Sequence, residues 1–268
     1  MRRLVGASDL LWLTFDSLRY DTAASALALG LTPNLARWLG PRGWERRETP
    51  GTFTLPAHWA FFHGFLPTDP DAPGAPRLFA IAREDSVTTG PGTCVFTDQA
   101  NVIAGLAARG YLTVCVGGVG FFDKQNPLGN VLPSLFAEST WEPAFGTRAR
   151  DSARHQVDWA VARLARVPRD QRVLMFLNLS ATHVPHAHYA NDPAATDSVA
   201  TQRLALADLD RHLPRLVDAM TARGPVVCLW MADHGEAYGE DGRFGHRIAH
   251  PTVLTVPYAE LELGLARG

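Results

Sequence analysis

Four separate runs of apolar residues constrain the fold of this chain more than any other feature. They are DLLWLTF (Asp9–Phe15), LTVCVGG (residues 112–118), RVLMFLNLS (172–180) and PVVCLWMA (225–232). Continuous apolar runs of this length, without polar alternation, are typical of strands that are covered on both faces of a sheet. The chain is therefore expected to build a buried, largely parallel sheet.

Helical patterns lie between these runs. They cover residues 32–39, 99–110, 151–166 and 198–223, and we expect Pro214 to kink or break the last of them. Alternating strands and helices predict an α/β fold, a three-layer α/β/α sandwich. A length of 268 residues with 46% hydrophobic content allows one large domain or two small ones. Because no stretch resembles an interdomain linker, we expect a single domain over residues 1–268.

The charge balance argues against a partner held by bulk electrostatics. Lys and Arg number 25 against 27 Asp and Glu, which gives a net charge of -2. We therefore expect neither nucleic acid nor an anionic membrane as a partner, and any recognition of phosphate must be local.

The cysteines and the N-terminal sequence are used to predict the cellular compartment of the protein. Cys94, Cys115 and Cys228 are widely spaced and odd in number, which indicates free thiols and no disulfide framework. The apolar run that begins at Leu10 is short and leads directly into Asp16, so it is interpreted as a strand and not as a signal peptide. These features predict a cytoplasmic protein.

Three of the four predicted strands end in polar residues that could bind a metal. Asp16 follows the first, Asp233 and His234 follow the last, and the third runs into ATHVPHAH, with GRFGHRIAH later in the chain. A single Asp or His at such a position is usually a turn or surface residue. Parallel strands, however, bring their carboxyl ends to one edge of the sheet, and carboxylates with imidazoles suit zinc or manganese.

Five segments in order carry a resemblance to a known family. They are TFDSLRYD, TPNLARWL, TFTLPAHWAFFHGFLP, ATHVPH and ADHGEAYGEDGRFGH, and they extend over nearly the whole chain. Together they resemble the alkaline phosphatase superfamily, in its sulfatase-like and phosphonate monoester hydrolase-like branch, and most of all its short bacterial members. The resemblance implies that Asp16, Asp233 and His234 are ligands of one metal ion, and that Thr54 is the nucleophile and fourth ligand.

The local sequence around Thr54 permits two interpretations. Pro56 suits the first turn of a helix over residues 56–64, so Thr54 could simply cap that helix. A helix N-terminus also favours an anionic phosphoryl group, and a divalent cation lowers the pKa of a coordinated hydroxyl enough for it to attack. The cluster of Asp16, Asp233 and His234 favours the nucleophile.

Departures from the sulfatase pattern bear on the substrate. Sulfatases carry a Cys or Ser that is converted to formylglycine, and Thr54 cannot follow that route. Their usual Ser and Arg are replaced by Ala57 and His58. The resemblance therefore implies chemistry at phosphorus and not at sulfur.

The remaining histidines receive less definite roles. The resemblance implies that His183 and His246 contact the substrate or its leaving group, or that His246 is a ligand of a second metal. His58 follows Thr54 by one helical turn and is expected to face the site. The roles of His186, His188 and His250 are left open, and so is the choice between one metal ion and two.

These inferences converge on a metal-dependent hydrolase or transferase of phosphate mono- or diesters that acts through a phosphothreonine intermediate. Zinc or manganese is the favoured ion, with magnesium, calcium or iron as alternatives, and the partner is a small phosphoryl-containing molecule. Phosphonate hydrolysis, a phosphomutase and phospho-headgroup transfer are alternatives within the superfamily. A non-catalytic metal- or partner-binding accessory protein is the alternative of another class, and the oligomeric state is left open.

Overall fold

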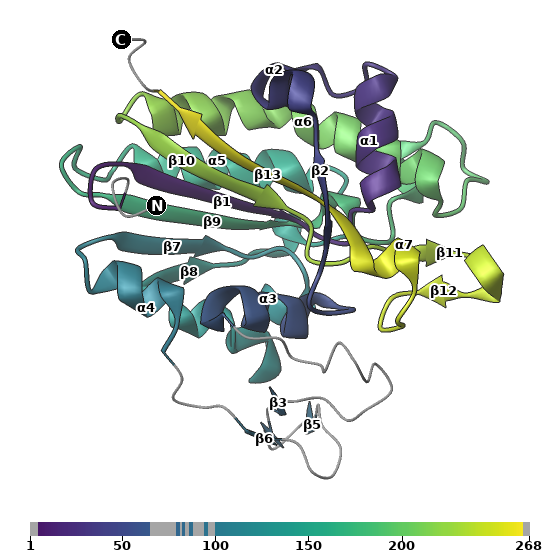
Figure 1. The fold of residues 1–268 in the computed structure, drawn as a ribbon, viewed down its shortest axis with the longest axis horizontal. Helices are drawn as coiled ribbons and strands as arrows, with labels where there is room; N and C mark the ends of the chain where they lie inside the picture. Colours follow the sequence, from purple (N-terminus) through teal and green to yellow (C-terminus); the bar gives the residue numbers. More distant parts are fainter. Residues whose placement is uncertain are drawn as a thin grey trace.

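The fold is built around one seven-stranded sheet (Figure 1). The computed structural model describes residues 5–64 and 100–264, together with four short strands between them. The sheet contains β1 (Asp9–Phe15), β2 (Glu45–Glu48), β7 (Leu112–Val116), β8 (Glu138–Thr140), β9 (Val173–Leu179), β10 (Val226–Met231) and β13 (Thr255–Leu263), in the order β2-β13-β10-β1-β9-β7-β8.

The strand directions match the predicted, largely parallel sheet. The four predicted strands appear as β10, β1, β9 and β7, adjacent to one another and parallel, and β8 extends the parallel part. Only β13 is reversed, since it pairs antiparallel with both β10 and β2. The carboxyl ends of β1, β9 and β10 therefore lie at the same edge.

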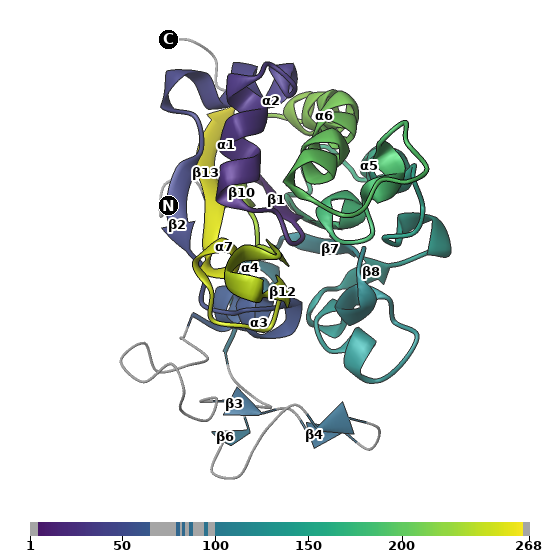
Figure 2. The ribbon, with the colours of Figure 1, turned by 90° about the vertical axis from the view of Figure 1, so that its right-hand side faces the viewer.

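Helices cover both faces of the sheet (Figure 2). One face carries α1 (Tyr20–Ala28), α2 (Pro33–Leu39), α5 (Ser152–Leu164) and α6 (Val199–Thr221), and the other carries α3 (Thr54–His63) and α4 (Val102–Ala107). The predicted three-layer α/β/α sandwich is confirmed.

Short elements complete the described chain. The hairpin of β11 (Ala237–Tyr238) and β12 (Phe244–Gly245) extends beyond the carboxyl ends of the strands, beside α7 (Pro251–Leu254) (Figure 1). The two-residue strands are β3 (Phe79–Ala80), β4 (Ala82–Arg83), β5 (Ser86–Val87) and β6 (Cys94–Val95). Short 3₁₀ helices cover Gly40–Arg42, Gly120–Phe122, Leu128–Asn130, Pro133–Leu135, Pro143–Phe145, Ser180–Thr182, Ala187–Tyr189 and Glu240–Gly242.

Side chains of one strand alternate between two hydrophobic cores. Along β1, Leu11, Leu13 and Phe15 pack with α1, α2, α5 and α6, whereas Trp12 packs with α3 and α4. Successive side chains of a strand point to opposite faces of the sheet, so a strand buried on both faces must be apolar throughout. This is the physical origin of the uninterrupted apolar runs in the sequence.

Helix α6 corrects the prediction made for Pro214. The helix continues from Val199 to Thr221 without a break at this residue. Proline has no N–H for the carbonyl four residues earlier, which here belongs to Asp210. The side-chain amide of Asn34 in α2 donates to that carbonyl at 3.2 Å. The packing of α2 against α6 thus supplies the missing hydrogen bond.

The cysteines agree with the prediction where the structure describes them. Cys115 and Cys228 are buried free thiols, and the side chain of Cys94 lies outside the described residues. Across residues 5–64 and 100–264, no helix combines the length and the apolarity needed to cross a bilayer.

Candidate metal centre

The register of the parallel strands places Asp16 next to Asp233. Thr14 of β1 pairs with Met231 of β10, and each carboxylate lies two residues beyond its member of that pair. Since side chains two residues apart share one face, the two carboxyl groups leave the sheet edge together. The backbone N–H of Asp16 donates to the carbonyl of Leu179 in β9 at 3.0 Å, which anchors the turn after β1.

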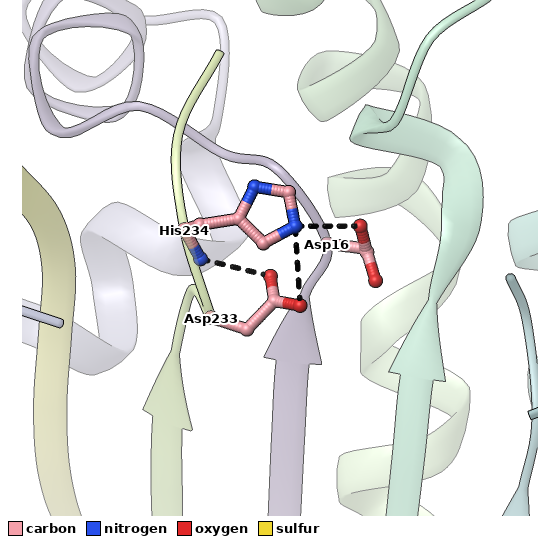
Figure 3. A group of neighbouring side chains, drawn as sticks. All are labelled: Asp16, Asp233 and His234. Carbon is pink, nitrogen blue, oxygen red and sulfur yellow. Dashed lines mark hydrogen bonds and ion pairs between the residues drawn. The ribbon is translucent and has the colours of Figure 1, made fainter. Parts of the chain in front are cut away.

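Asp16, Asp233 and His234 form a compact, fully buried cradle (Figure 3). One potential ligand atom from each residue lies within 4.8 Å of the other two. The Nε2 atom of His234 is 3.8 Å from Asp16 Oδ1 and 3.6 Å from Asp233 Oδ2. These spacings are too long for direct hydrogen bonds and leave room for a bridging ion.

Hydrogen bonding orients the His234 ring toward the cradle. Its Nδ1 is 2.8 Å from the carbonyl oxygen of Gly235, which can only accept, so Nδ1 carries the proton. The lone pair of Nε2 then faces the two carboxylates. A histidine whose second nitrogen donates to a backbone carbonyl is the usual arrangement of a metal-binding imidazole.

Thr54 is the first residue of α3, and its hydroxyl faces the same cradle. Its Oγ1 is 3.4 Å from Asp16 Oδ2 and 3.5 Å from His234 Nε2. The N-cap position belongs to Phe53, with no side-chain capping bond, so the hydroxyl of Thr54 does not cap the helix. Helix α3 begins two residues before the predicted start at Pro56.

A glycine allows the chain to approach α3 closely just before Thr54. A Cβ atom built on Gly51 would lie 2.5 Å from the backbone nitrogen of Ala57 and 2.9 Å from its Cα. No other residue fits without displacement of the first turn of the helix. Gly51 therefore helps fix the position of Thr54 at the sheet edge.

The electrostatics of the cradle favour a bound cation. Burial raises the pKa of Asp233 well above its usual range, and the Asp16 carboxylate raises that pKa further. Burial also opposes ionisation of Asp16, but His183, His234 and the amide of Asn178 outweigh it and lower the pKa of Asp16 overall. Two adjacent buried carboxylates cannot both ionise at little cost unless a positive charge lies between them.

One oxygen of the cradle also lacks a hydrogen bond. Asp233 Oδ1 accepts from the backbone N–H groups of Ser17 and His234 at 3.1 and 3.0 Å. Asp233 Oδ2 is buried without a hydrogen-bond partner among the described residues. A metal ion in contact with Oδ2, Asp16 and His234 would satisfy it, so the residues present fit a divalent cation.

Two further imidazoles lie above the cradle. The ring centroid of His246 is 4.6 Å from that of His234 and 5.5 Å from that of His183. His246 Nδ1 donates to Glu236 Oε2 at 2.7 Å, and His183 Nδ1 donates to the carbonyl of Val184 at 2.5 Å. In both rings the Nε2 atom is therefore left to accept or donate toward a substrate.

His58 borders the cradle, because its Nδ1 is 3.6 Å from Asp233 Oδ2, and it also packs into an aromatic cluster. It is fully buried, and its ring contacts the aromatic rings of Phe61, Phe62, Phe122 and Phe176. Its Nδ1 donates to the carbonyl of Thr54 at 2.8 Å, and Thr14 Oγ1 lies 3.2 Å from its Nε2. Burial lowers the pKa of His58 to about 4. Both nitrogens thus serve to hold the first turn of α3 against β1.

Two of the three histidines left open have polar partners in the structure. His186 is fully buried between Thr201 and Tyr238. His250 contacts Thr252 and Asp241, and the Nε2 atom of His188 is buried without a partner in the described part of the chain.

Asn178 is a member of the site that the sequence did not reveal. Its Nδ2 donates to Asp16 Oδ2 at 2.8 Å, and its Oδ1 accepts from the backbone of Val119 at 3.0 Å. It lies inside the apolar run of β9. A fully buried polar residue in a central strand was the only available signal, because such a residue requires a polar partner.

The fold is that of the alkaline phosphatase superfamily, as the resemblance implied. A protein of that superfamily from Vibrio parahaemolyticus superimposes with a TM-score of 0.54 at 14% identity, over 94% of this chain and 60% of the other. No family model matches the sequence, and no curated protein shows significant sequence similarity to it.

Two periplasmic domains resemble the fold more strongly. One is the C-terminal periplasmic domain of phosphoethanolamine transferase EptC from Campylobacter jejuni, with a TM-score of 0.62, 12% identity, and coverage of 96% of this chain and 79% of the other. The second is the corresponding domain of EcEptC from Escherichia coli, solved in complex with Zn, with a TM-score of 0.60, 13% identity, and coverage of 95% and 72%.

These neighbours contradict the expectation of a cytoplasmic protein, because both domains are periplasmic. The residues used for that inference carry no information about the compartment. The apolar run from Leu10 is explained by a buried central strand, and Cys115 and Cys228 are enclosed in the core.

Proposed function

We propose that the chain hydrolyses or transfers phosphate mono- or diesters, with Thr54 as the nucleophile and a divalent ion held by Asp16, Asp233 and His234. The observation that carries the proposal is the position of the Thr54 hydroxyl. Thr54 is the first residue of the buried helix α3. Its Oγ1 lies 3.4 Å from Asp16 Oδ2 and 3.5 Å from His234 Nε2. A capping role does not explain this orientation, since the hydroxyl makes no capping bond.

The residues of the chain can be assigned to the steps of an in-line displacement. Thr54 Oγ1 attacks phosphorus while its proton is directed toward Asp16 Oδ2, and the bond from phosphorus to the leaving oxygen breaks. The N-terminal amides of α3 face the phosphoryl oxygens. When bound, the divalent ion supplies Lewis-acid stabilisation of the negative charge that develops there.

The imidazoles above the cradle are suited to proton transfer. His183 and His246 both have Nδ1 satisfied, so either ring, when it enters the reaction as an imidazolium, can donate its Nε2 proton to the departing alcohol and later accept a proton from the incoming one. If that nucleophile is water, the phosphothreonine is hydrolysed. If it is another alcohol, the phosphoryl group is transferred.

The molecule that accepts the phosphoryl group from Thr54, water or an alcohol, distinguishes hydrolysis from transfer. EptC of Campylobacter jejuni is a phosphoethanolamine transferase, and its similar fold supports transfer of a phospho-headgroup as the second candidate. Turnover of a nitrophenyl phosphodiester with an added alcohol distinguishes the two, because transfer produces a new phosphoester of that alcohol and hydrolysis does not.

The proposal is tested with the metal-loaded protein and matched threonine variants. Thr54→Ala is expected to keep most metal binding and to lose turnover of nitrophenyl phosphate esters by at least about 1000-fold. Thr52→Ala is the control, because it removes a hydroxyl two residues earlier in the same segment. Mass spectrometry of quenched wild-type protein should find a phosphoryl group on Thr54.

Three outcomes would contradict this function. Full turnover by Thr54→Ala with metal bound would exclude the covalent route. Absence of metal binding by the wild-type protein would exclude the cradle as a metal centre. Metal binding without turnover of any phosphate, phosphonate or sulfate ester would favour a binding protein instead.

A further inference from the structure

The strongest unexplained feature near the cradle is the side chain of Arg247. It follows His246 directly, and its guanidinium carbon lies 4.8 Å from the centre of the Phe53 ring. Phe53 is the residue immediately before Thr54. Arg247 is therefore adjacent in sequence to His246, and its guanidinium contacts the residue that precedes Thr54.

The Arg247 side chain is exposed and has no ion-pair partner among residues 5–64 and 100–264. Its guanidinium forms no hydrogen bond or salt bridge with any residue in the described part of the chain. Arg19 makes the contrast clear: it is buried, pairs with Asp21 and Glu240, and donates to the carbonyl of Glu236 at 3.3 Å. Arg19 is thus fully engaged in holding the β11–β12 hairpin, whereas the donors of Arg247 remain available.

The backbone of Arg247 is also unusual. Its φ angle is 72°, in the left-handed region that side chains other than glycine seldom adopt. The conformation is fixed by a 2.8 Å hydrogen bond from its N–H to the carbonyl of Thr52. Residues held in such conformations gather at binding sites, where the surrounding structure compensates for their cost. Glycine could occupy this position without strain, yet it would provide no guanidinium.

Stacking on Phe53 gives the guanidinium a defined orientation. A guanidinium over an aromatic face is held by cation–π attraction, while its N–H groups point outward in the plane. Five donors in this planar arrangement match the two oxygens of a carboxylate or the oxygens of a phosphate. A guanidinium over the ring of Phe53, the residue before Thr54, with no ion pair in the described part of the chain, is suited to a second anion on the same ligand.

We propose that Arg247 is a specificity-determining residue, which binds an anionic group, carboxylate or phosphate, that the substrate carries outside its reacting phosphoryl group. The inference rests on the proposed function, because it assigns the reacting phosphoryl group to the neighbouring cradle. It narrows the substrate class to phosphoesters with a second negative charge.

The proposal is tested by binding, with ligands that cannot be turned over. Metal-loaded protein is titrated calorimetrically with phenylphosphonate and with its 3-carboxy and 4-carboxy derivatives. We expect the wild-type protein to bind at least one carboxylated ligand about tenfold more tightly than phenylphosphonate, which is typical of one charge-assisted contact. Arg247→Gln and Arg247→Gly should remove this preference and leave the affinity for phenylphosphonate nearly unchanged.

Two variants separate recognition from structure. Arg243→Gln removes an exposed arginine from the same hairpin region, and its preference for the carboxylated ligand should equal that of the wild type. Arg247→Gly relieves the left-handed strain, so its Tm should be equal to or above that of the wild type even though the preference is lost. A lower affinity for the carboxylated ligand in a more stable protein cannot result from misfolding.

The results distinguish failure of this inference from failure of the proposed function. A preference that persists in Arg247→Gly, or a wild-type protein that prefers neither carboxylated ligand, overturns the role of Arg247. Turnover of nitrophenyl phosphate mono- and diesters is measured separately. If the wild-type protein turns over none of them, the proposed catalysis fails, whereas the phosphonate affinities still decide the role of Arg247.

Discussion

The Nε2 atom of His186 lies 2.7 Å from the hydroxyl oxygen of Tyr238, and this contact joins two segments that carry the imidazoles above the cradle. His186 follows His183 in the chain after β9, and Tyr238 belongs to the hairpin that precedes His246. His186 Nδ1 is 2.9 Å from Thr201 Oγ1. With Nδ1–H donated to Thr201, Nε2 accepts the hydroxyl proton of Tyr238.

Loss of this bond should affect the placement of both imidazoles. Tyr238→Phe removes only the hydroxyl, and we expect kcat/KM for phosphate esters to fall about tenfold with metal affinity unchanged, because small misplacements reduce rates strongly. Tyr258→Phe is the matched control, since the hydrogen bond of its hydroxyl in the described structure is to Glu260 on the surface.

Hydrogen exchange provides a measurement of the same bond that does not depend on activity. In Tyr238→Phe, amides of residues 183–190 and of the β11–β12 hairpin should exchange faster than in the wild type, while those of β1 and β9 do not change. Faster exchange in one segment alone would mean that the bond does not couple the two.

The pH dependence of stability should report on His186. Burial lowers the pKa of this residue to about 4, although Asp197 partly opposes the shift. An unfolded imidazole titrates near 6.5, so between about pH 6.5 and 4 the unfolded chain binds a proton that the folded protein does not. Stability is therefore lost as pH falls through this window and changes no further below it.

The variant His186→Gln isolates this contribution, because it keeps a polar side chain and removes the titration. Urea unfolding of metal-free protein at pH 7 and at pH 5 should give a smaller pH dependence in the variant, by up to about 1.4 kcal/mol per pH unit. An unchanged pH dependence would show that His186 is protonated in the folded protein.

The cradle should be less stable without its ion. Metal removal leaves the buried carboxylates of Asp16 and Asp233 adjacent, with the pKa of Asp233 raised by burial and by Asp16. Neutral pH lies above the pKa of an Asp in the unfolded chain. A carboxyl group whose pKa is higher in the folded protein than in the unfolded chain therefore lowers the free energy of unfolding at this pH. Asp233→Asn should therefore stabilise the metal-free protein and abolish stabilisation by added metal.

A second buried carboxylate provides the control for this experiment. Asp9 is buried at the opposite end of β1, where it pairs with Arg223 at 2.9 Å and Arg172 at 3.4 Å. Asp9→Asn should be destabilising, because it leaves the partly buried guanidinium groups of Arg223 and Arg172 with a weaker partner. Thermal unfolding with and without chelator measures both variants, and a stabilising effect of added metal on Asp233→Asn would remove Asp233 from the ligand set.

The central part of the fold could be predicted because its physical signal is local. The strands β1, β7, β9 and β10 are buried on both faces, so their sequences are continuously apolar, and Asp16 and Asp233 follow directly from the parallel arrangement. The edge strand β2 has no comparable apolar run in its sequence. All four residues of β2 are charged and exposed, and its pairing depends entirely on β13.

Contacts between residues that are far apart in the sequence could not be predicted from local sequence patterns. Thr32 occupies the N-cap position of the helix predicted over residues 32–39, where Thr is a favoured cap, but its side chain makes no capping bond. Instead, Asp210 of α6 accepts hydrogen bonds from the backbone of Asn34 at 3.1 Å and of Leu35 at 2.7 Å. A cap supplied from 175 residues away cannot be read from the sequence around the helix.

This long-range cap leads to a prediction about stability. Asp210 is fully buried, and Asp210→Ala would remove the acceptor of two backbone N–H groups of α2, while the side chain of Asn34 would keep only its bond to the backbone carbonyl of residue 210. We expect a loss of roughly 2–4 kcal/mol in the free energy of unfolding.

Thr32→Val is the matched variant, because the Thr32 hydroxyl is buried without a partner among the described residues. Its replacement by a methyl group of similar size should be neutral or slightly stabilising. Urea denaturation measures both variants, and a larger loss for Thr32→Val than for Asp210→Ala would return the cap to Thr32.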